Sequence, residues 1–138
     1  MGWLMLKMAL AVITERALQR LVYRQLKGQL FDVIMVADAE AAVRVLELRK
    51  PHLVCIDLLL PRASGYEVCE FIRSSGRLRD VPVLVMSDRI SAADRAHAEE
   101  AGADGFLPKP FSIHQFSEQV RALMAGAPLS MRGLRKID

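Results

Sequence analysis

Short apolar runs that alternate with amphipathic stretches are the feature of this chain that most limits its fold. Each run has the length of a strand and is apolar almost throughout, which is typical of parallel strands covered on both faces. The five runs are Met8–Ile13, Asp32–Val36, His52–Ile56, Val81–Met86 and Gly105–Leu107. We therefore expect a parallel sheet with a layer of helices on each side.

Helical patterns follow each of these runs. The first places Leu18, Leu21, Val22 and Leu26 on one face. The five predicted helices are Glu15–Lys27, Ala39–Arg49 after a cap at Asp38, Tyr66–Arg73, a helix that Ser91 caps and that ends at Ala101, and Ile113–Met124. Five strands in alternation with five helices predict an α/β fold, a doubly wound (βα)5 sandwich with a five-stranded parallel sheet and right-handed crossovers.

Length and composition favour one globular domain. The chain has 138 residues, of which 52% are hydrophobic and 25% charged. We expect a domain over residues 8–125, an N-terminal extension over 1–7 and a basic C-terminal tail over 126–138. Because no run is long enough to cross a bilayer, and because Cys55 and Cys69 lie in apolar runs without metal-ligand spacing, we expect a cytoplasmic protein with reduced thiols.

The net charge of +3 makes nucleic-acid binding a function to consider. Basic residues are scattered along the chain, except in the tail, where Arg132, Arg135 and Lys136 lie close together. Scattered charge is typical of a solvated surface and not of a nucleic-acid footprint. We therefore expect no specific nucleic-acid partner.

Polar residues lie where several of the predicted strands end. In doubly wound sheets, ligands bind at the carboxyl ends of the strands. Asp57, Ser87 and Lys109 fall at such ends. A carboxylate that acts as a nucleophile, with a hydroxyl and an ammonium group as donors to phosphoryl oxygens, would form a site that handles phosphoryl groups. The spacing alone leaves open a purely structural Asp–Lys ion pair.

Three segments carry a resemblance to a known family. They are KPHLVCIDLLLPRASGYEVCEFIR (Lys50–Arg73), VPVLVMS (Val81–Ser87) and AGADGFLPKPF (Ala101–Phe111). The chain resembles the receiver domain of two-component response regulators from residue 8 to about residue 124. The resemblance implies the flavodoxin-like receiver topology, phosphorelay signalling, and partners that are histidine kinases or output proteins.

Roles for single residues follow from this resemblance by position. Asp57 matches the phosphoacceptor, Ser87 the switch hydroxyl, Phe106 the rotating aromatic residue and Lys109 the phosphate-contacting lysine. Pro110 matches the proline that in this family follows a cis peptide bond.

The chain also departs from the pattern of the family. Receivers place two acidic residues at the end of the first strand to hold Mg²⁺ with the phosphoacceptor, and here these positions are Ile13 and Thr14. Glu15 is the only acid nearby, and we expect it in the first turn of the helix. Because Mg²⁺ requires oxygen ligands, we expect no metal site, no cofactor and at most weak Mg²⁺ binding.

A second departure follows Ser87. Asp88 stands where receivers usually carry Ala or Gly, and its plainer interpretation is an N-terminal cap for the fourth helix or a solvated acid in a loop. Together the two departures predict a degenerate receiver that is not an enzyme and acts by protein contact. The alternative is an ordinary receiver that a histidine kinase phosphorylates at Asp57.

The interaction face is also predicted from the family. It consists of the predicted fourth helix, fifth strand and fifth helix, and it could also serve a homodimer. Small residues lie on the fourth helix, and its charged residues could select the partner. The small residues are Ala92, Ala96 and Ala98, and the charged ones are Asp94, Arg95, Glu99 and Glu100.

Three rival functions fit the residues less well. A phosphatase of the haloacid dehalogenase type needs a second acid two residues after Asp57, where Leu59 stands. A flavodoxin-like carrier needs a loop of small hydroxyl and glycine residues after the first strand, where Thr14, Glu15 and Arg16 stand. A metal site would need clustered ligands, but the three histidines of the chain lie far apart in the sequence and do not have the spacing of metal ligands.

Overall fold

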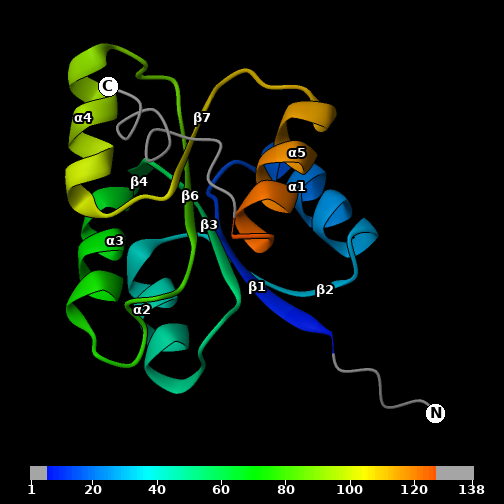
Figure 1. Ribbon diagram of the computed structural model, residues 1–138, viewed down its shortest axis with the longest axis horizontal. Helices are drawn as coiled ribbons and strands as arrows, with labels where there is room; N and C mark the ends of the chain where they lie inside the picture. The colour runs from blue at the N-terminus through cyan, green and yellow to red at the C-terminus, as the bar shows by residue number, and fades with distance from the viewer. Residues whose placement is uncertain (1–5, 127–138) are drawn as a thin grey trace.

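The computed structural model describes residues 6–126, which form one parallel sheet between two layers of helices (Figure 1). The sheet has the strand order β2-β1-β3-β6-β7. Its strands are β1 (Lys7–Val12), β2 (Phe31–Val36), β3 (Leu53–Asp57), β6 (Val83–Ser87) and β7 (Gly105–Pro108). The helices are α1 (Arg16–Gly28), α2 (Ala39–Leu48), α3 (Gly65–Ser74), α4 (Ala92–Ala101) and α5 (Ile113–Met124).

Two apolar cores lie on the two faces of the sheet. Alternate residues of β1 serve the two sides, with Leu10 and Val12 in one core and Ala9 and Ala11 in the other. The first core packs against α2, α3 and α4, and the second packs against α1 and α5. The predicted doubly wound fold is confirmed.

The predicted helix caps are also present. The Asp38 carboxylate accepts a hydrogen bond from the Ala41 N–H at 2.8 Å, and Ser91 and Asp94 form a capping box at the start of α4. Gly102 ends α4 with a φ of 105°, a conformation that suits glycine. Asp88 does not cap this helix, because the capping hydroxyl belongs to Ser91. It is an exposed acid in the loop after β6, which was the other interpretation of this residue.

Element limits differ from the predicted ones by one or two residues, and one element was missed. Strand β6 begins at Val83, because the Val81 N–H donates to the Leu78 carbonyl in a turn and Pro82 has no N–H to donate. A short antiparallel hairpin follows β3, with strands β4 (Leu59–Leu60) and β5 (Ala63–Ser64). Two-residue strands leave too little periodicity to detect.

The ends of the predicted domain are only partly covered. Strand β1 begins at Lys7, one residue earlier than expected, so Lys7 belongs to the sheet and not to an extension. The rest of the predicted extension, apart from Leu6, and all of the predicted tail after Gly126 lie outside the described residues. Among residues 6–126, no helix has the length and apolar character needed to span a bilayer.

Candidate functional site

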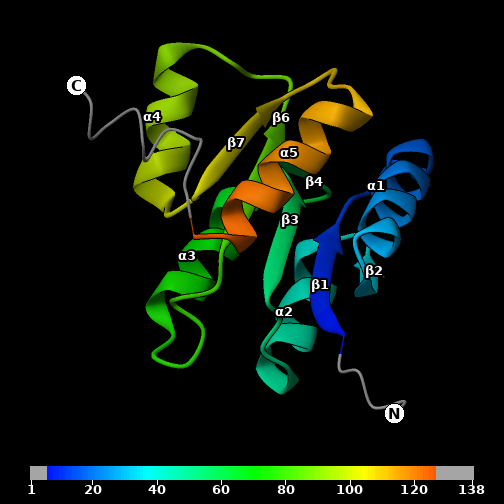
Figure 2. The ribbon, with the colours of Figure 1, turned by 45° about the vertical axis from the view of Figure 1, so that its right-hand side comes forward.

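Neighbouring strands bring three of the predicted site residues to one edge of the sheet. Strand β3 lies beside β6, with Asp57 opposite Met86, and β6 lies beside β7, with Ser87 opposite Pro108. The Lys109 N–H then donates to the Ser87 carbonyl at 2.8 Å. Figure 2 shows β3, β6 and β7 side by side. Asp57, Ser87 and Lys109 therefore lie at the carboxyl edge of the sheet, although 52 residues separate Asp57 from Lys109.

Asp57 and Lys109 form a direct ion pair. The Lys109 Nζ lies 2.8 Å from Asp57 Oδ2, and the two side chains are 20% and 8% exposed. A charge-assisted bond of this length compensates a carboxylate that is largely removed from water. The sequence spacing allowed an ion pair between Asp57 and Lys109 as one possibility, and the structure contains this ion pair.

Gly65 is required by the backbone beneath Asp57. A Cβ atom on Gly65 would lie 2.7 Å from the Asp57 carbonyl oxygen and 3.2 Å from Leu58 Cα. The Gly65 N–H donates to the Leu58 carbonyl at 2.8 Å. The start of α3 is thus packed directly on the chain that carries Asp57, and only glycine fits this approach.

Ser87 makes its hydrogen bonds within its own loop. The hydroxyl accepts from the Arg89 N–H at 2.8 Å and donates to the Arg89 carbonyl at 3.2 Å, and the residue is 1% exposed. The next residue, Asp88, is exposed. The hydroxyl is therefore near the carboxyl edge, engaged with backbone and not with Asp57.

The Phe106 side chain packs in the core on one face of the sheet and is buried from solvent. It is 3% exposed and belongs to the core shared with α2, α3 and α4, and the Arg95 guanidinium lies 5.0 Å from its ring centroid. The peptide bond between Lys109 and Pro110 is cis, as the resemblance implies.

The end of β1 presents no carboxylate to Asp57. The Ile13 side chain is fully buried in the core under α1 and α5, and its carbonyl accepts from Gln19 Nε2 at 2.6 Å. The Thr14 hydroxyl donates to the Ala37 carbonyl at 2.8 Å. Glu15 was expected in the first turn of α1, but it lies at the N-cap, one residue before the helix begins at Arg16, and it is exposed.

These donors do not fit a Mg²⁺ ion. Mg²⁺ is held by hard oxygen ligands in octahedral geometry, usually with carboxylates among them. Here Asp57 is paired with Lys109, Ile13 supplies hydrocarbon and the Thr14 hydroxyl is bonded to backbone. Within the described part of the chain, no group of three or more His, Cys, Asp or Glu side chains could hold a metal ion.

A cleft of about 390 Å³ opens beside Lys109, between α1 and the loop after β7. Leu18, Leu21 and Phe111 give it apolar walls, and Glu15 and Asp88 lie at its border. The cleft therefore holds two acidic side chains together with the Lys109 ammonium group. The two carboxylates repel an anion that enters it, and Lys109 attracts one.

Two structural contacts on the face of the sheet covered by α2, α3 and α4 were not predicted from the sequence. Arg73 donates to Asp104 Oδ2 at 2.5 Å and to the carbonyls of Gly102, Arg79 and Val81, and thereby joins α3 to the loops before β6 and β7. A second contact joins Tyr66 and His97, whose rings stack at 3.9 Å between α3 and α4. Single charged or aromatic residues in helices carry no sequence signal for such contacts.

Comparison with known proteins identifies the family. The profile of the response regulator receiver domain matches residues 10–121. The chain belongs to the response regulator receiver family. It is thus a receiver domain of two-component signalling, whose members interact with histidine kinases and output domains.

Sequence relatives of this receiver are longer proteins. The response regulator MprA of Mycobacterium leprae is 35% identical over 115 residues, which are 83% of this chain and 50% of MprA. MprA of Mycobacterium ulcerans is 34% identical over 115 residues, with 83% and 49% covered. The chain therefore spans about half the length of the curated relatives it matches.

Solved receivers share its fold. The receiver domain of a histidine kinase from Syntrophus aciditrophicus superposes with a TM-score of 0.80 at 26% identity, covering 90% of this chain and 94% of that one. The receiver domain of sensor kinase PA1611 from Pseudomonas aeruginosa superposes with a TM-score of 0.79 at 25% identity, covering 88% and 99%. The PA1611 structure has a magnesium ion coordinated in its active site cleft.

Proposed function

We propose that this receiver is degenerate and signals by protein contact, with weak or no Mg²⁺-dependent phosphorylation. The observation that carries the proposal is the end of β1, where a buried Ile13 and a backbone-bonded Thr14 take the positions of the acidic pair. Phosphoryl transfer to a carboxylate brings two anions together, and in this family Mg²⁺ offsets their repulsion. With only Lys109 beside Asp57, that compensation is incomplete.

The second candidate is an ordinary receiver that a histidine kinase phosphorylates at Asp57. It is favoured by the buried Asp57 and by the Lys109 ammonium 2.8 Å away. In that case an Asp57 oxygen bonds to the phosphorus of the donor while the bond from phosphorus to the leaving group breaks. Lys109 then supports the charge on the phosphoryl oxygens, and Ser87 and Phe106 transmit the change.

The proposed partner surface is the face formed by α4, β7 and α5. It suits a histidine kinase, an output protein or a second copy, because exposed Ala92 and Ala96, together with Ala93, allow close approach along α4. Ala98, which was also expected on this face, is instead fully buried in the core. Asp94 and Glu100 add charges that can select among partners. We place this signalling in the cytoplasm, without nucleic acid or membrane as a partner.

The deciding experiment is the intact mass of the protein after incubation with acetyl phosphate and Mg²⁺. We expect the mass to stay that of the unmodified chain, because the acidic metal ligands are replaced by Ile13 and Thr14 and because Glu15 and Asp88 place negative charge in the cleft beside Lys109. Asp57→Asn is the matched control, and like the wild type it should show no phosphoryl adduct. In cells, Asp57→Asn should leave signalling largely unchanged.

The opposite result would select the second candidate. A phosphoryl adduct that forms readily on the wild type and disappears in Asp57→Asn would establish phosphotransfer at this carboxylate. The proposal of a degenerate receiver would then be withdrawn.

A further inference from the structure

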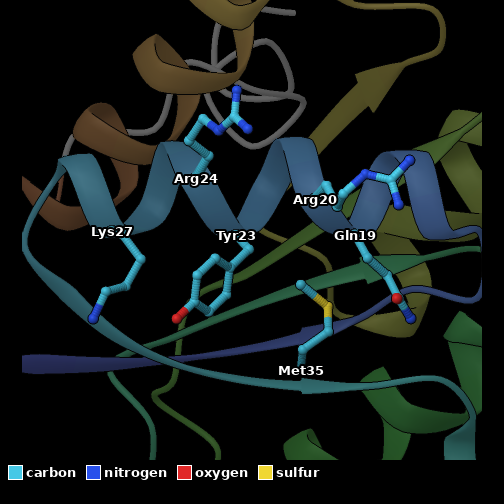
Figure 3. Close-up of a pocket in the computed structure, with 6 residues that line it drawn as sticks. All are labelled: Gln19, Arg20, Tyr23, Arg24, Lys27 and Met35. Carbon is cyan, nitrogen blue, oxygen red and sulfur yellow. The ribbon is translucent and has the colours of Figure 1, made fainter.

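A groove that shares no lining residue with the cleft beside Lys109 runs between α1 and the outermost strand, β2. Its volume is about 590 Å³, and its lining residues are Gln19, Arg20, Tyr23, Arg24, Lys27 and Met35. Figure 3 shows Tyr23 and Lys27 pointing from α1 toward the strand, and Met35 pointing from β2 toward Tyr23 and Gln19. Tyr23 is 46% exposed, which leaves a large amphipathic side chain in solvent.

Strand β2 is an open edge. It stands at the end of the sheet, and β1 is the one strand that pairs with it in the described part of the chain. The Val36 carbonyl accepts from the Ile13 N–H, so the backbone groups of Val36, and by alternation those of Ile34, face β1. The backbone N–H and C=O groups of Phe31, Val33 and Met35 therefore face outward.

The residues whose backbone groups face outward also carry their side chains on the face of the sheet that the groove and α1 occupy. Val33 and Met35 pack against the core under α1, whereas Ile34 and Val36 pack against the opposite core. An extended chain added to this edge would hydrogen-bond to Phe31, Val33 and Met35 and place every second side chain beside α1. The edge carries neither proline nor lysine, the residues that commonly prevent such pairing.

The charge beside this edge has one sign. Helix α1 contains Arg16, Arg20, Arg24 and Lys27 and no acidic residue, and three of these four cations line the groove. Asp32 is exposed on β2, but it shares the alternation of Ile34, so its side chain lies on the other face. The potential along the groove therefore favours an anionic ligand.

We propose that the edge of β2 and the groove under α1 form a docking site for an extended acidic peptide segment of a partner protein. The segment would add a strand to the sheet outside β2, with its carboxylates toward Arg20 and Lys27. This site is separate from the Asp57 site and from the α4–β7–α5 face, so it does not depend on whether Asp57 accepts phosphate.

Two other occupants fit the groove less well. A second copy that paired antiparallel through β2 would bring the two α1 helices together on one face of the joined sheet, and Arg20 and Lys27 of one protomer would approach the same residues of the other. Like charges oppose this arrangement. Nucleic acid would match the charge, but it has no backbone amide groups to pair with the edge of a strand.

The test uses the full chain and a capped heptapeptide of alternating glutamate and valine, EVEVEVE, followed by amide NMR. We expect saturable binding with a Kd below about 1 mM. The amides of Phe31, Val33 and Met35 should shift and become protected from hydrogen exchange, and those of Asp32 and Ile34 should respond less. This alternation distinguishes strand pairing from general charge attraction.

Charge variants test the second part of the proposal. The double change Arg20→Glu and Lys27→Glu should weaken peptide binding by about tenfold or more. The matched control, Arg44→Glu with Lys50→Glu, makes the same charge change at exposed positions elsewhere and should alter binding by less than about twofold. The analogue KVKVKVK, and EVEVEVE methylated on the nitrogens that would face β2, should not bind.

Four results would overturn the proposal. They are the absence of saturable binding, equal binding of the methylated peptide, tighter binding of an oligothymidylate of the same length, and a concentration-dependent dimer that protects Val33 and Met35 without any peptide. The last two would assign the edge to nucleic acid or to a second copy.

Discussion

The ammonium group of Lys109 lies 2.8 Å from Asp57 Oδ2, and this pair is the main electrostatic contact at the carboxyl edge of the sheet. Removing the cation would leave a carboxylate that is 8% exposed without its charge partner. We expect Lys109→Ala to lower the free energy of unfolding by about 2–4 kcal/mol, less than for a wholly buried pair because Lys109 keeps contact with water. Urea unfolding measures this loss.

Asp57→Asn serves as the comparison for that variant. The partly exposed Lys109 can turn toward solvent, so we expect a loss of about 1 kcal/mol or less. A loss in Asp57→Asn as large as in Lys109→Ala would show that the carboxylate stabilises the fold through contacts other than this ion pair.

The close packing of Gly65 on the Asp57 backbone leads to a second prediction about the carboxyl edge of the sheet. A Cβ atom at this position would lie 2.7 Å from the Asp57 carbonyl oxygen, and backbone cannot yield as a flexible side chain does. We expect Gly65→Ala to cost about 1–3 kcal/mol and to shift the amide resonances around Asp57. Gly76→Ala, where nothing lies within 4 Å of the added Cβ, should change stability by less than about 1 kcal/mol.

Metal binding can be introduced at the end of β1. We expect the wild type to show no saturable response to sub-millimolar Mg²⁺, by calorimetry or by the amide shifts of Asp57 and Leu59. Ile13→Asp with Thr14→Asp should lower stability without metal by about 2–5 kcal/mol, because a fully buried isoleucine becomes a carboxylate near Asp57. Mg²⁺ should restore part of the loss.

Adding Asp88→Ala to that double variant tests whether the remaining site is intact. If only the metal ligands and the open approach are missing, the triple variant should take up phosphate from acetyl phosphate in the presence of Mg²⁺, and Asp57→Asn should abolish the uptake. A triple variant that folds, binds Mg²⁺ and yet stays unmodified would mean that Ser87, Phe106 or Lys109 is also unsuited to phosphotransfer.

Arg73 connects α3 to the loops that precede β6 and β7. Its guanidinium reaches Asp104 and three backbone carbonyls, and Asp104 also accepts from the Val83 N–H at 3.0 Å. We expect Arg73→Ala to cost about 2–4 kcal/mol in urea unfolding and Arg73→Lys somewhat less, because an ammonium cannot reach all of these acceptors. Arg79→Ala, which removes an exposed side chain nearby, should cost less than about 0.5 kcal/mol.

The buried thiols predict a loss of stability in alkali. Burial raises the pKa of Cys55 from 9.0 to about 12, and it raises the pKa of Cys69 by a similar amount. Between pH 9 and 12 the unfolded chain loses these protons while the folded chain keeps them, so stability falls as the pH rises through this window. Cys55→Ala should flatten the fall by up to about 1.4 kcal/mol per pH unit.

Native-state thiol labelling gives an independent check on this argument. Both cysteines are fully buried and keep their protons, so iodoacetamide should react with them only after unfolding. Rapid labelling of either thiol in the folded protein at neutral pH would contradict the burial of that residue.

The sequence by itself determined the alternation of strands and helices, the caps at Asp38 and Ser91, and the identity of the residues at the strand ends. These features depend on local periodicity and on side chains that bond to nearby backbone, so a short window of sequence contains them. The proposal that Ile13 and Thr14 stand in place of an acidic pair also came from the sequence, once the resemblance had supplied the register.

Only the tertiary structure decided which of these residues touch. The approach of Gly65 to Asp57, the reach of Arg73 to Asp104 and the engagement of Ser87 with Arg89 depend on how the elements pack and on the paths of the loops. The groove under α1 is likewise set by the position of β2 at the end of the sheet, because strand order is a relation between distant segments that no local pattern encodes.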